Sequence, residues 1–358
     1  MLFKDIQYKS DCLYFRGDVP CVPHKDFGFK CDNCSFYKES KGKILIIKLG
    51  AIGDVIRTTP LLRKIWKEYP NYEVWWLTLS PAILPKSVNK ILPFNLESIV
   101  TLPNIEFDIL YSLDKDLYAC SLANNIKAKE KFGFHLVNGK PAPINELAEH
   151  KFFTGLFDDL NKTNDQSYLQ EIFGICGWEF NGEEYILEYS KSFKWDIQND
   201  GKKIIGLNTG CGDRWVTRLW SYDYWVELIK LLQNNGFYPL LLGGKQEDEK
   251  NSKLAEETGA AYLGHYPLEQ FISEVDQCDA IVTAVTMGMH LSIGLQKPTI
   301  LFNNIFNPKE FELYGRGEII MPEKVCTCYF SPKCKNKEYF CMDYITPDKI
   351  FEAVKRCF

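Results

Sequence analysis

The chain has 358 residues, of which 46% are hydrophobic and 25% are charged, and its formal net charge at pH 7 is -5. This length exceeds what one hydrophobic core usually holds, so we expect two domains. The mild negative charge excludes a global basic surface of the kind that attracts nucleic acid or an acidic membrane. The longest apolar runs have the length of a β-strand and are too short to span a bilayer.

Residues 1–42 read as an irregular extension rich in cysteine, lysine and aromatic side chains. The first twelve residues lack the apolar core of a signal peptide, which predicts a cytoplasmic protein. Thirteen cysteines in such a chain need an explanation other than disulfides.

A first α/β series begins with KILIIKL (43–49), an apolar run typical of a strand buried in a parallel sheet. The turn GAIGD follows, and an apolar face then predicts a helix over 55–68. A second strand is expected at 73–78, so the segment forms a βαβ unit. Weaker signals predict strands at 109–113 and 131–134 and a helix at 116–126.

A second series follows the polar linker predicted at 190–201. Its elements alternate between short apolar strands and amphipathic helices, and Ser221 is the expected N-cap of one of these helices. We predict strands at 203–208, 238–244, 280–286 and 298–303, and helices at 221–233, 247–257, 267–277 and 286–295. Two such series imply two doubly wound domains, with ligands at the carboxyl ends of the strands and the site in the cleft between the halves.

The turn at 50–54 places Asp54 at the start of a helix, where the helix dipole favours an ionised carboxylate. A carboxylate at the mouth of a cleft can act as a general base, although an isolated Asp there is more often an N-cap. The spacing is not G-x-G-x-x-G, and the next strand carries no acidic residue for a ribose, which disfavours a nicotinamide site.

Three glycine-containing loops follow strands of the second series. NTGCGDR (208–214) offers backbone N–H groups to phosphates, and Arg214 and Arg218 can neutralise a diphosphate. GGKQE (243–247) places Glu247 where a ribose contact fits, although an acidic helix start explains it equally well. VTMGMH (285–290) opens a helix; Thr286 is its better candidate for a ligand contact, because His290 has the pattern of a core histidine.

Eight of the cysteines fall into two clusters. Cys12, Cys21, Cys31 and Cys34 lie in the extension, and Cys326, Cys328, Cys334 and Cys341 lie near the end of the chain. Four thiolates suit a closed tetrahedral site for zinc or iron, so both clusters are candidate structural metal sites. The five scattered cysteines read as small buried hydrophobes. The triplet 114–116 has the form D-x-D but is common by chance.

Taken together, these strings resemble the glycosyltransferases of family 9, the ADP-heptose heptosyltransferases of lipopolysaccharide assembly. The resemblance begins near Lys43, and KILIIKLGAIGDVIRTTPLL is close to that family's opening motif. It implies the GT-B fold, in which two Rossmann-like domains face a central cleft. The implied divisions are 1–42 for the Cys-rich extension, 43–195 for the acceptor domain, 196–345 for the nucleotide-sugar domain, and 346–358 for a helix returning to the first domain.

The resemblance also implies roles. Asp54 matches the general base that deprotonates an acceptor hydroxyl as it attacks the heptose, so that one displacement inverts the anomeric carbon without a catalytic divalent cation. Gly53 and Arg57 would lie on the acceptor side. The implied donor-site residues are Thr209, Gly210, Arg214, Arg218, Glu247, Thr286, Met287, Gly288, Met289 and His290.

VTM at 285–287, the string NNIFNPKEFELYG and the late cysteines are similar to the heptosyltransferases that modify autotransporter adhesins. Those proteins carry cysteine-bound iron and form rings, which implies a protein serine or glycan acceptor, bound iron or zinc, and a possible homo-oligomer. Val285 stands where the family has an aspartate, which keeps another nucleotide sugar open as donor. A noncatalytic metal-binding scaffold and, more distantly, an NAD-dependent oxidoreductase are the remaining alternatives.

Overall fold

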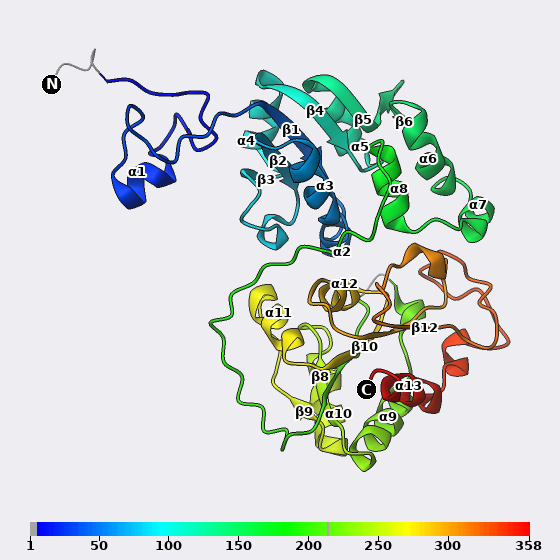
Figure 1. Ribbon diagram of the computed structural model, residues 1–358. Coiled ribbons are helices and arrows are strands. Elements are labelled where there is room, and N and C mark those ends of the chain that lie inside the picture. Colours follow the sequence, from blue (N-terminus) through cyan, green and yellow to red (C-terminus); the bar gives the residue numbers. More distant parts are fainter. Residues whose placement is uncertain (1–5, 213–214) are drawn as a thin grey trace. The chain divides into compact units, whose positions relative to one another are not determined.

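The computed structural model describes residues 6–212 and 215–358 and contains two six-stranded sheets (Figure 1). Inter-residue contacts divide the chain into two units, each built around one sheet. The first unit takes residues up to 51 together with 59–149 and 174–178; the second takes 52–58, 150–173 and 179–358. Helix α2 (Ile52–Ile56) therefore belongs to the second unit, although the chain on either side of it belongs to the first.

The first sheet has the strand order β3-β2-β1-β4-β5-β6 and is parallel except for the β5–β6 pair. Its strands are β1 (Gly42–Ile47), β2 (Tyr72–Thr78), β3 (Lys90–Pro93), β4 (Glu106–Ser112), β5 (Lys127–Val137) and β6 (Lys140–Pro143). The central strand β1 is buried from Ile44 to Ile47. A parallel strand covered on both faces needs such an unbroken apolar run, so the prediction at 43–49 is confirmed.

The second sheet is parallel throughout, with the order β12-β11-β10-β7-β8-β9. Its strands are β7 (Ile204–Asn208), β8 (Tyr238–Leu242), β9 (Ala261–Tyr262), β10 (Ala280–Ala284), β11 (Thr299–Phe302) and β12 (Gly317–Ile320). The order turns back between β7 and β10, where a doubly wound sheet places its ligand at the carboxyl ends of the strands.

Helices connect the strands of both sheets (Figure 1). They are α1 (Val22–Phe27), α3 (Pro60–Glu68), α4 (Leu96–Thr101), α5 (Leu117–Asn125), α6 (Glu149–Thr154), α7 (Asp158–Thr163), α8 (Tyr168–Ile175), α9 (Tyr222–Asn234), α10 (Asp248–Thr258), α11 (Leu268–Asp276), α12 (Met287–Gly294) and α13 (Pro347–Lys355). Ser221 caps α9 by accepting a hydrogen bond from the backbone N–H of Tyr224, as predicted. None of the helices in the described ranges has the length and apolar composition that crossing a membrane requires.

The helix predicted over 55–68 is interrupted. The structure has α2 before the break and α3 after it, with a turn over residues 57–59. Pro60 occupies the first position of α3 and has no N–H to donate to the preceding turn. This break separates α2, which lies in the second unit, from α3, which lies in the first.

The helix predicted at 346–358 is present as α13. Ile350, Phe351 and Val354 are buried in the core of the second unit, together with Trp225 of α9. The apolar face of α13 therefore packs within the second unit, and its return to the first domain stays a prediction.

Glu274 in α11 provides a stability prediction. Its side chain is buried, burial raises its pKa to about 8, and neither carboxyl oxygen has a hydrogen-bond partner within the described residues. The folded protein keeps this proton, whereas the unfolded chain releases it near pH 4.5. The stability contributed by the neutral acid is therefore complete below pH 4.5 and is lost as pH rises to about 8.

We expect Glu274→Gln, a neutral isostere, to match the wild type near pH 4.5 and to be more stable at pH 8 by on the order of 3 kcal/mol. Urea unfolding at both pH values measures this difference. The exposed Glu269 of the same helix supplies the control, Glu269→Gln, which should show no such pH-dependent gain. An equal effect of Glu274→Gln at both pH values would contradict the buried neutral acid.

Candidate active site

Helix α2 packs against α12 at a point where only glycine fits. A Cβ atom on Gly53 would lie 2.4 Å from Cδ2 of His290, so any larger residue would push the two helices apart. His290 is buried, and burial together with the nearby Arg57 lowers its pKa to about 3. The ring is therefore neutral at physiological pH, and its Nδ1 lies 3.5 Å from the hydroxyl of Tyr185.

Asp54 of α2 takes part in a charged cluster within the second unit. The guanidinium of Arg57 lies 2.7 Å from the Asp54 carboxylate and 2.7 Å from that of Glu310. It also stacks over the ring of Tyr168, at 3.5 Å from the ring centroid. Burial by itself would lower the pKa of Arg57, but the two carboxylates reverse this effect and raise it. One carboxylate oxygen of Asp54 is thus paired with Arg57, while 33% of the Asp54 side chain stays exposed.

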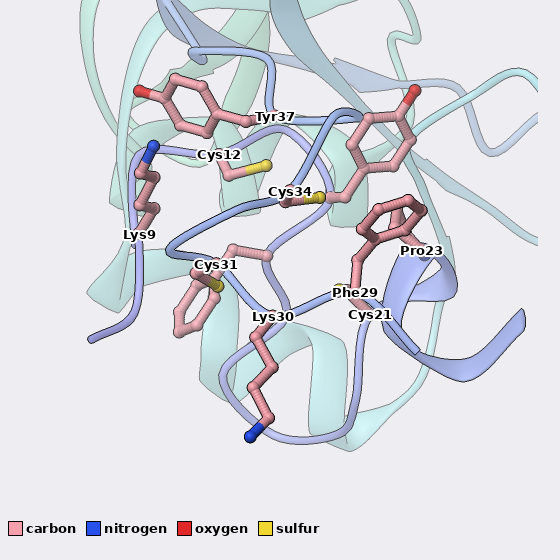
Figure 2. Close-up of a pocket in the computed structure, with 11 residues that line it drawn as sticks. Lys9, Cys12, Cys21, Pro23, Phe29, Lys30, Cys31, Cys34 and Tyr37 are labelled. Atoms are coloured by element: carbon pink, nitrogen blue, oxygen red, sulfur yellow. The ribbon is translucent and has the colours of Figure 1, made fainter. Parts of the chain in front are cut away.

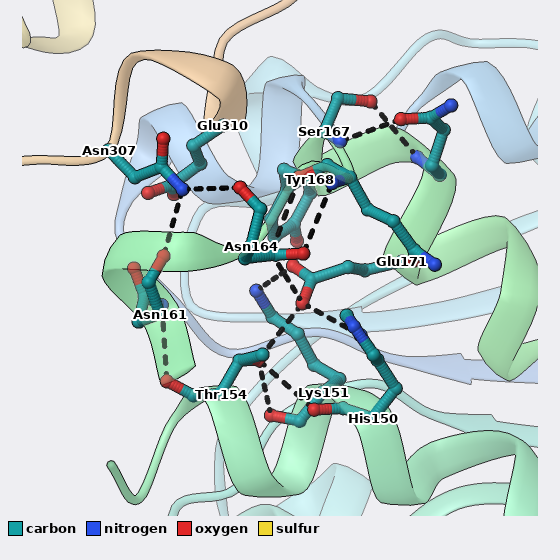
Figure 3. A network of polar contacts seen from close by, with 12 residues as sticks. His150, Lys151, Thr154, Asn161, Asn164, Ser167, Tyr168, Glu171, Asn307 and Glu310 are labelled. Atoms are coloured by element: carbon teal, nitrogen blue, oxygen red, sulfur yellow. Dashed lines mark hydrogen bonds and ion pairs between the residues drawn. The ribbon is translucent and has the colours of Figure 1, made fainter. Parts of the chain in front are cut away.

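A network of polar contacts fixes the residues around Arg57 (Figure 3). The buried carboxylate of Glu171 accepts hydrogen bonds from Lys151, Thr154 and Asn164 and faces His150 at 3.3 Å. The Asn307 amide donates to the backbone oxygens of Asn161 and Asn164 at 2.8 and 2.7 Å. These bonds tie the segment that carries Tyr168 to the loop that carries Glu310.

A glycine-containing loop follows β7, and helix α10 supports it. The Thr209 hydroxyl is buried and donates to the Asn251 side chain at 2.6 Å, while the Lys250 ammonium donates to the Thr209 backbone oxygen at 2.7 Å. Burial lowers the pKa of Lys250. The side chain of Thr209 is thus directed into the fold, and its contacts hold the loop; its place in a donor site stays a prediction.

Glu247 joins two glycine loops at the ends of β7 and β8. Its carboxylate accepts from the backbone N–H of Gly244 at 3.0 Å. The same carboxylate covers Gly210, where a Cβ atom would lie 2.0 Å from Oε1 of Glu247. A side chain at position 210 would therefore displace Glu247, which explains the glycine in physical terms.

Arg218 is a buried cation beside the same loop. Its guanidinium donates to the backbone oxygen of Cys211 at 3.1 Å, and it has no carboxylate partner among residues 6–212 and 215–358. Burial lowers its pKa to about 10, which still leaves it charged near neutral pH. A buried positive charge without a counterion is a natural partner for an anion. The predicted donor residue Arg214 lies outside the described residues.

Thr286 connects the loop after β7 to α12. Its hydroxyl caps α12 by accepting from the N–H of Gly288 at 3.1 Å and accepts from the Asn208 amide at 3.0 Å. The side chain of Met289 is fully buried, and Met287 is partly exposed. Val285, where the family resemblance implied an aspartate, packs on an apolar cluster of Ile305, Phe306 and Cys328.

The D-x-D triplet is structural in this chain. Asp114 pairs with Lys48 and accepts from the backbone N–H groups of Leu49 and Gly50. Asp116 caps α5 by accepting from the N–H groups of Tyr118 and Ala119. Together with Leu79, Phe94 and others, both residues line an open pocket of about 470 Å³ in the first unit.

The four late cysteines form two close pairs. The Sγ atoms of Cys328 and Cys334 lie 3.8 Å apart. A hydrogen bond from Cys326, with a second from Asn304, lowers the pKa of Cys341 to about 6. Backbone N–H groups donate to the sulfur of Cys326 and to that of Cys328, the latter from Lys335 at 3.0 Å. Such bonds support thiolate charge, which a metal ligand requires.

The four early cysteines line one small pocket (Figure 2). All thirteen cysteines are free thiols. Across the described ranges, no three Cys, His, Asp or Glu side chains are already close enough to hold a metal ion. Both metal sites therefore stay predictions.

Sequence reasoning missed Tyr168, Glu310 and Lys250. Tyr168 and Glu310 contact Arg57 from segments that are distant in sequence, so no local pattern revealed them. Lys250 lies three residues after Glu247 and thus on the same face of α10, a spacing that could have identified it.

Comparison with known proteins finds similar sequences and structures among the glycosyltransferases. Residues 168–340 match glycosyltransferase family 9 (heptosyltransferase). Lipooligosaccharide heptosyltransferase 2 of Campylobacter jejuni is 19% identical over 323 residues, covering 85% of this chain and 96% of that relative. A family 9 glycosyl transferase from Veillonella parvula has a TM-score of 0.70 at 16% identity, covering 89% of this chain and 98% of that one.

TibC from enterotoxigenic Escherichia coli, an iron-containing dodecameric glycosyltransferase, has a TM-score of 0.53 at 12% identity, covering 89% of this chain and 76% of that one. The same protein has been solved with ADP-D-beta-D-heptose as an iron-containing heptosyltransferase. The two parallel-sheet α/β domains match these structures, which confirms the predicted GT-B fold.

Proposed function

We propose that the chain is a heptosyltransferase of glycosyltransferase family 9, which transfers heptose from ADP-heptose to an acceptor hydroxyl with inversion; the family match over residues 168–340 and the similarity to a curated heptosyltransferase support this proposal. The main support for this proposal is the contact between α2 and α12. Asp54 lies on a helix packed against α12, and the N-cap of α12, Thr286, is hydrogen-bonded to the end of β7. The candidate base, Asp54, and the candidate diphosphate-binding loop after β7 are therefore linked to each other through contacts with α12.

In the proposed reaction, the Asp54 carboxylate takes the proton of the acceptor hydroxyl as its oxygen attacks the anomeric carbon of the sugar. The bond between that carbon and the diphosphate oxygen breaks, and ADP leaves with the electron pair. Arg218 and the N–H groups of the loop after β7 stabilise the negative charge that develops on the diphosphate. Because the chain itself supplies this positive charge, we propose that turnover does not depend on added Mg²⁺.

The acceptor proposed is a protein serine or a glycan, and we place the reaction in the cytoplasm. Thirteen free thiols fit a reducing compartment. The similarity to TibC supports a possible homo-oligomer and a metal bound by the late cysteines. Those cysteines fit such a metal because two sulfur pairs and their N–H donors already lie together. An iron or zinc ion there would cross-link the segment between residues 326 and 341.

Val285 supports a second candidate, a transferase for another nucleotide sugar. A valine packed on apolar side chains cannot accept a hydrogen bond from a sugar hydroxyl, as a carboxylate would. The rest of the proposed mechanism would be unchanged in that case.

A panel of nucleotide sugars tests both candidates by thermal shift and by nucleotide release. We expect selective stabilisation and slow ADP release with ADP-heptose. Arg218→Met should weaken ADP binding by about 10- to 100-fold, because charge-assisted hydrogen bonds contribute about 1.5–3 kcal/mol each. The exposed Lys245 in the neighbouring loop supplies the control, Lys245→Met. A response to a different sugar selects the second candidate, and no response to any donor contradicts both.

A further inference from the structure

The segment before β1 lacks a hydrophobic core of its own. Between residues 6 and 41 it has one short helix, α1, and one isolated β-bridge, and Pro23 is its only buried residue. Its turns are nevertheless closed by backbone bonds such as those from Leu13 to Lys38 and from Ser40 to Asp11. A segment this small usually needs a disulfide or a metal to hold one conformation.

Four cysteines of this segment converge on one pocket (Figure 2). Cys12 sits at the bridge to Glu39, Cys21 precedes α1, and Cys31 and Cys34 flank a two-residue turn. The other walls are mainly apolar and include Pro23 and Phe29. His24 does not line the pocket, since its Nδ1 is bonded to the backbone oxygen of Phe29. The candidate ligand set is therefore four thiols.

The arrangement of the four thiols favours metal binding over a role as small buried hydrophobic side chains. Thiols that served only as small hydrophobes would be buried, but all four are partly exposed. Four thiolates select a soft, tetrahedral ion, and zinc is the ion that closed Cys₄ structural sites most often hold. A zinc ion with four thiolates has a net charge of -2, and Lys9 and Lys30 on the pocket wall offset it.

We propose that Cys12, Cys21, Cys31 and Cys34 bind a structural zinc ion that holds the N-terminal segment together. The four thiols release their protons as the ion binds, so no oxidant or reductant is involved. The thiols line the pocket without yet being at metal-ligand spacing, and binding draws them inward. This inference is independent of the proposed transferase reaction and of the late cysteines.

Metal analysis of the full chain tests the proposal. The protein is purified under reducing conditions, reconstituted with Zn²⁺ alone, and compared with two double variants, Cys31→Ser/Cys34→Ser and Cys328→Ser/Cys334→Ser. Cys357→Ser, which removes a partly exposed thiol outside both clusters, is the control. The Cys31/Cys34 variant should lose one zinc ion per chain, whereas the control should lose none. The Cys328→Ser/Cys334→Ser variant separately measures metal binding at the late cysteines.

Two further readouts separate loss of the site from loss of the fold. With Co²⁺ in place of zinc, the wild type should show the absorption of tetrahedral cobalt–thiolate sites. In the Cys31/Cys34 variant this absorption should fall by the share that one bound ion contributes. Limited proteolysis should cut that variant between residues 12 and 34, while its far-UV circular dichroism spectrum matches that of the wild type and shows that both sheets are folded. Unchanged zinc content and an unchanged cobalt spectrum in the Cys31/Cys34 variant would overturn the proposal, as would a wild type that binds metal only at the late cysteines.

Discussion

Asp54→Asn should lower the rate of sugar transfer by about 10²- to 10⁴-fold, the range typical of a lost general base. Asparagine has nearly the same shape but cannot take a proton from the acceptor hydroxyl. The fold should persist because Arg57 keeps its ion pair with Glu310 and its contact with Tyr168. Donor binding should persist as well, since Arg218, Glu247 and the loop after β7 are unchanged.

Initial rates of ADP release with a saturating acceptor measure the loss, and the thermal shift with ADP-heptose measures donor binding. Asp223→Asn, at an exposed position in the first turn of α9, is the control for removal of one carboxylate. A rate that falls together with donor affinity would indicate a binding role for Asp54. Transfer at the wild-type rate would falsify its assignment as the base.

The regular elements near the site were predictable because each has a local cause. The apolar run at 43–49 matches β1, and the Ser221 cap matches the start of α9. A turn was predicted over 50–54, but Gly53 lies within helix α2, and the reason for this glycine was not predicted either: it makes room for His290, 237 positions later in the chain. A spacing within one loop cannot reveal a contact of that range.

The charged cluster shows the same limit more clearly. The sequence placed Arg57 near the acceptor, whereas the structure surrounds it with Asp54, Glu310 and Tyr168. Two of these partners come from segments whose placement depends on the Glu171 network, not on helix or strand periodicity. Such polar networks are decided by tertiary packing, so their members could be recognised only once the fold was known.

The D-x-D triplet illustrates the converse case, in which a motif has chemical potential but a structural role. Asp114 holds the start of the turn after β1 through the N–H groups of Leu49 and Gly50, and Asp116 caps α5. Both carboxylates thus accept hydrogen bonds from backbone N–H groups that hold local structure. Asp54 instead forms its ion pair with the side chain of Arg57, and 33% of the Asp54 side chain is exposed.

Arg57→Gln should lower the free energy of unfolding by roughly 3 kcal/mol, the lower end of the range for removing one partner of a buried ion pair. The arginine is 14% exposed and faces two carboxylates, 33% and 19% exposed, which would be left without their cation. We take the lower end because solvent still reaches Asp54.

Urea unfolding at pH 7 measures this loss. Lys64→Gln is the matched control, because Lys64 forms an i,i+4 pair with the more exposed Glu68 and its loss should change stability by less than about 1 kcal/mol. The rate of sugar transfer by Arg57→Gln adds a second readout, because the proposed role of Arg57 is to position Asp54 through their ion pair and not to accept a proton. The wild-type rate in an Arg57→Gln protein that has lost stability would show that the cluster supports only the fold. A reduced rate with unchanged donor binding would show that it also orients the base.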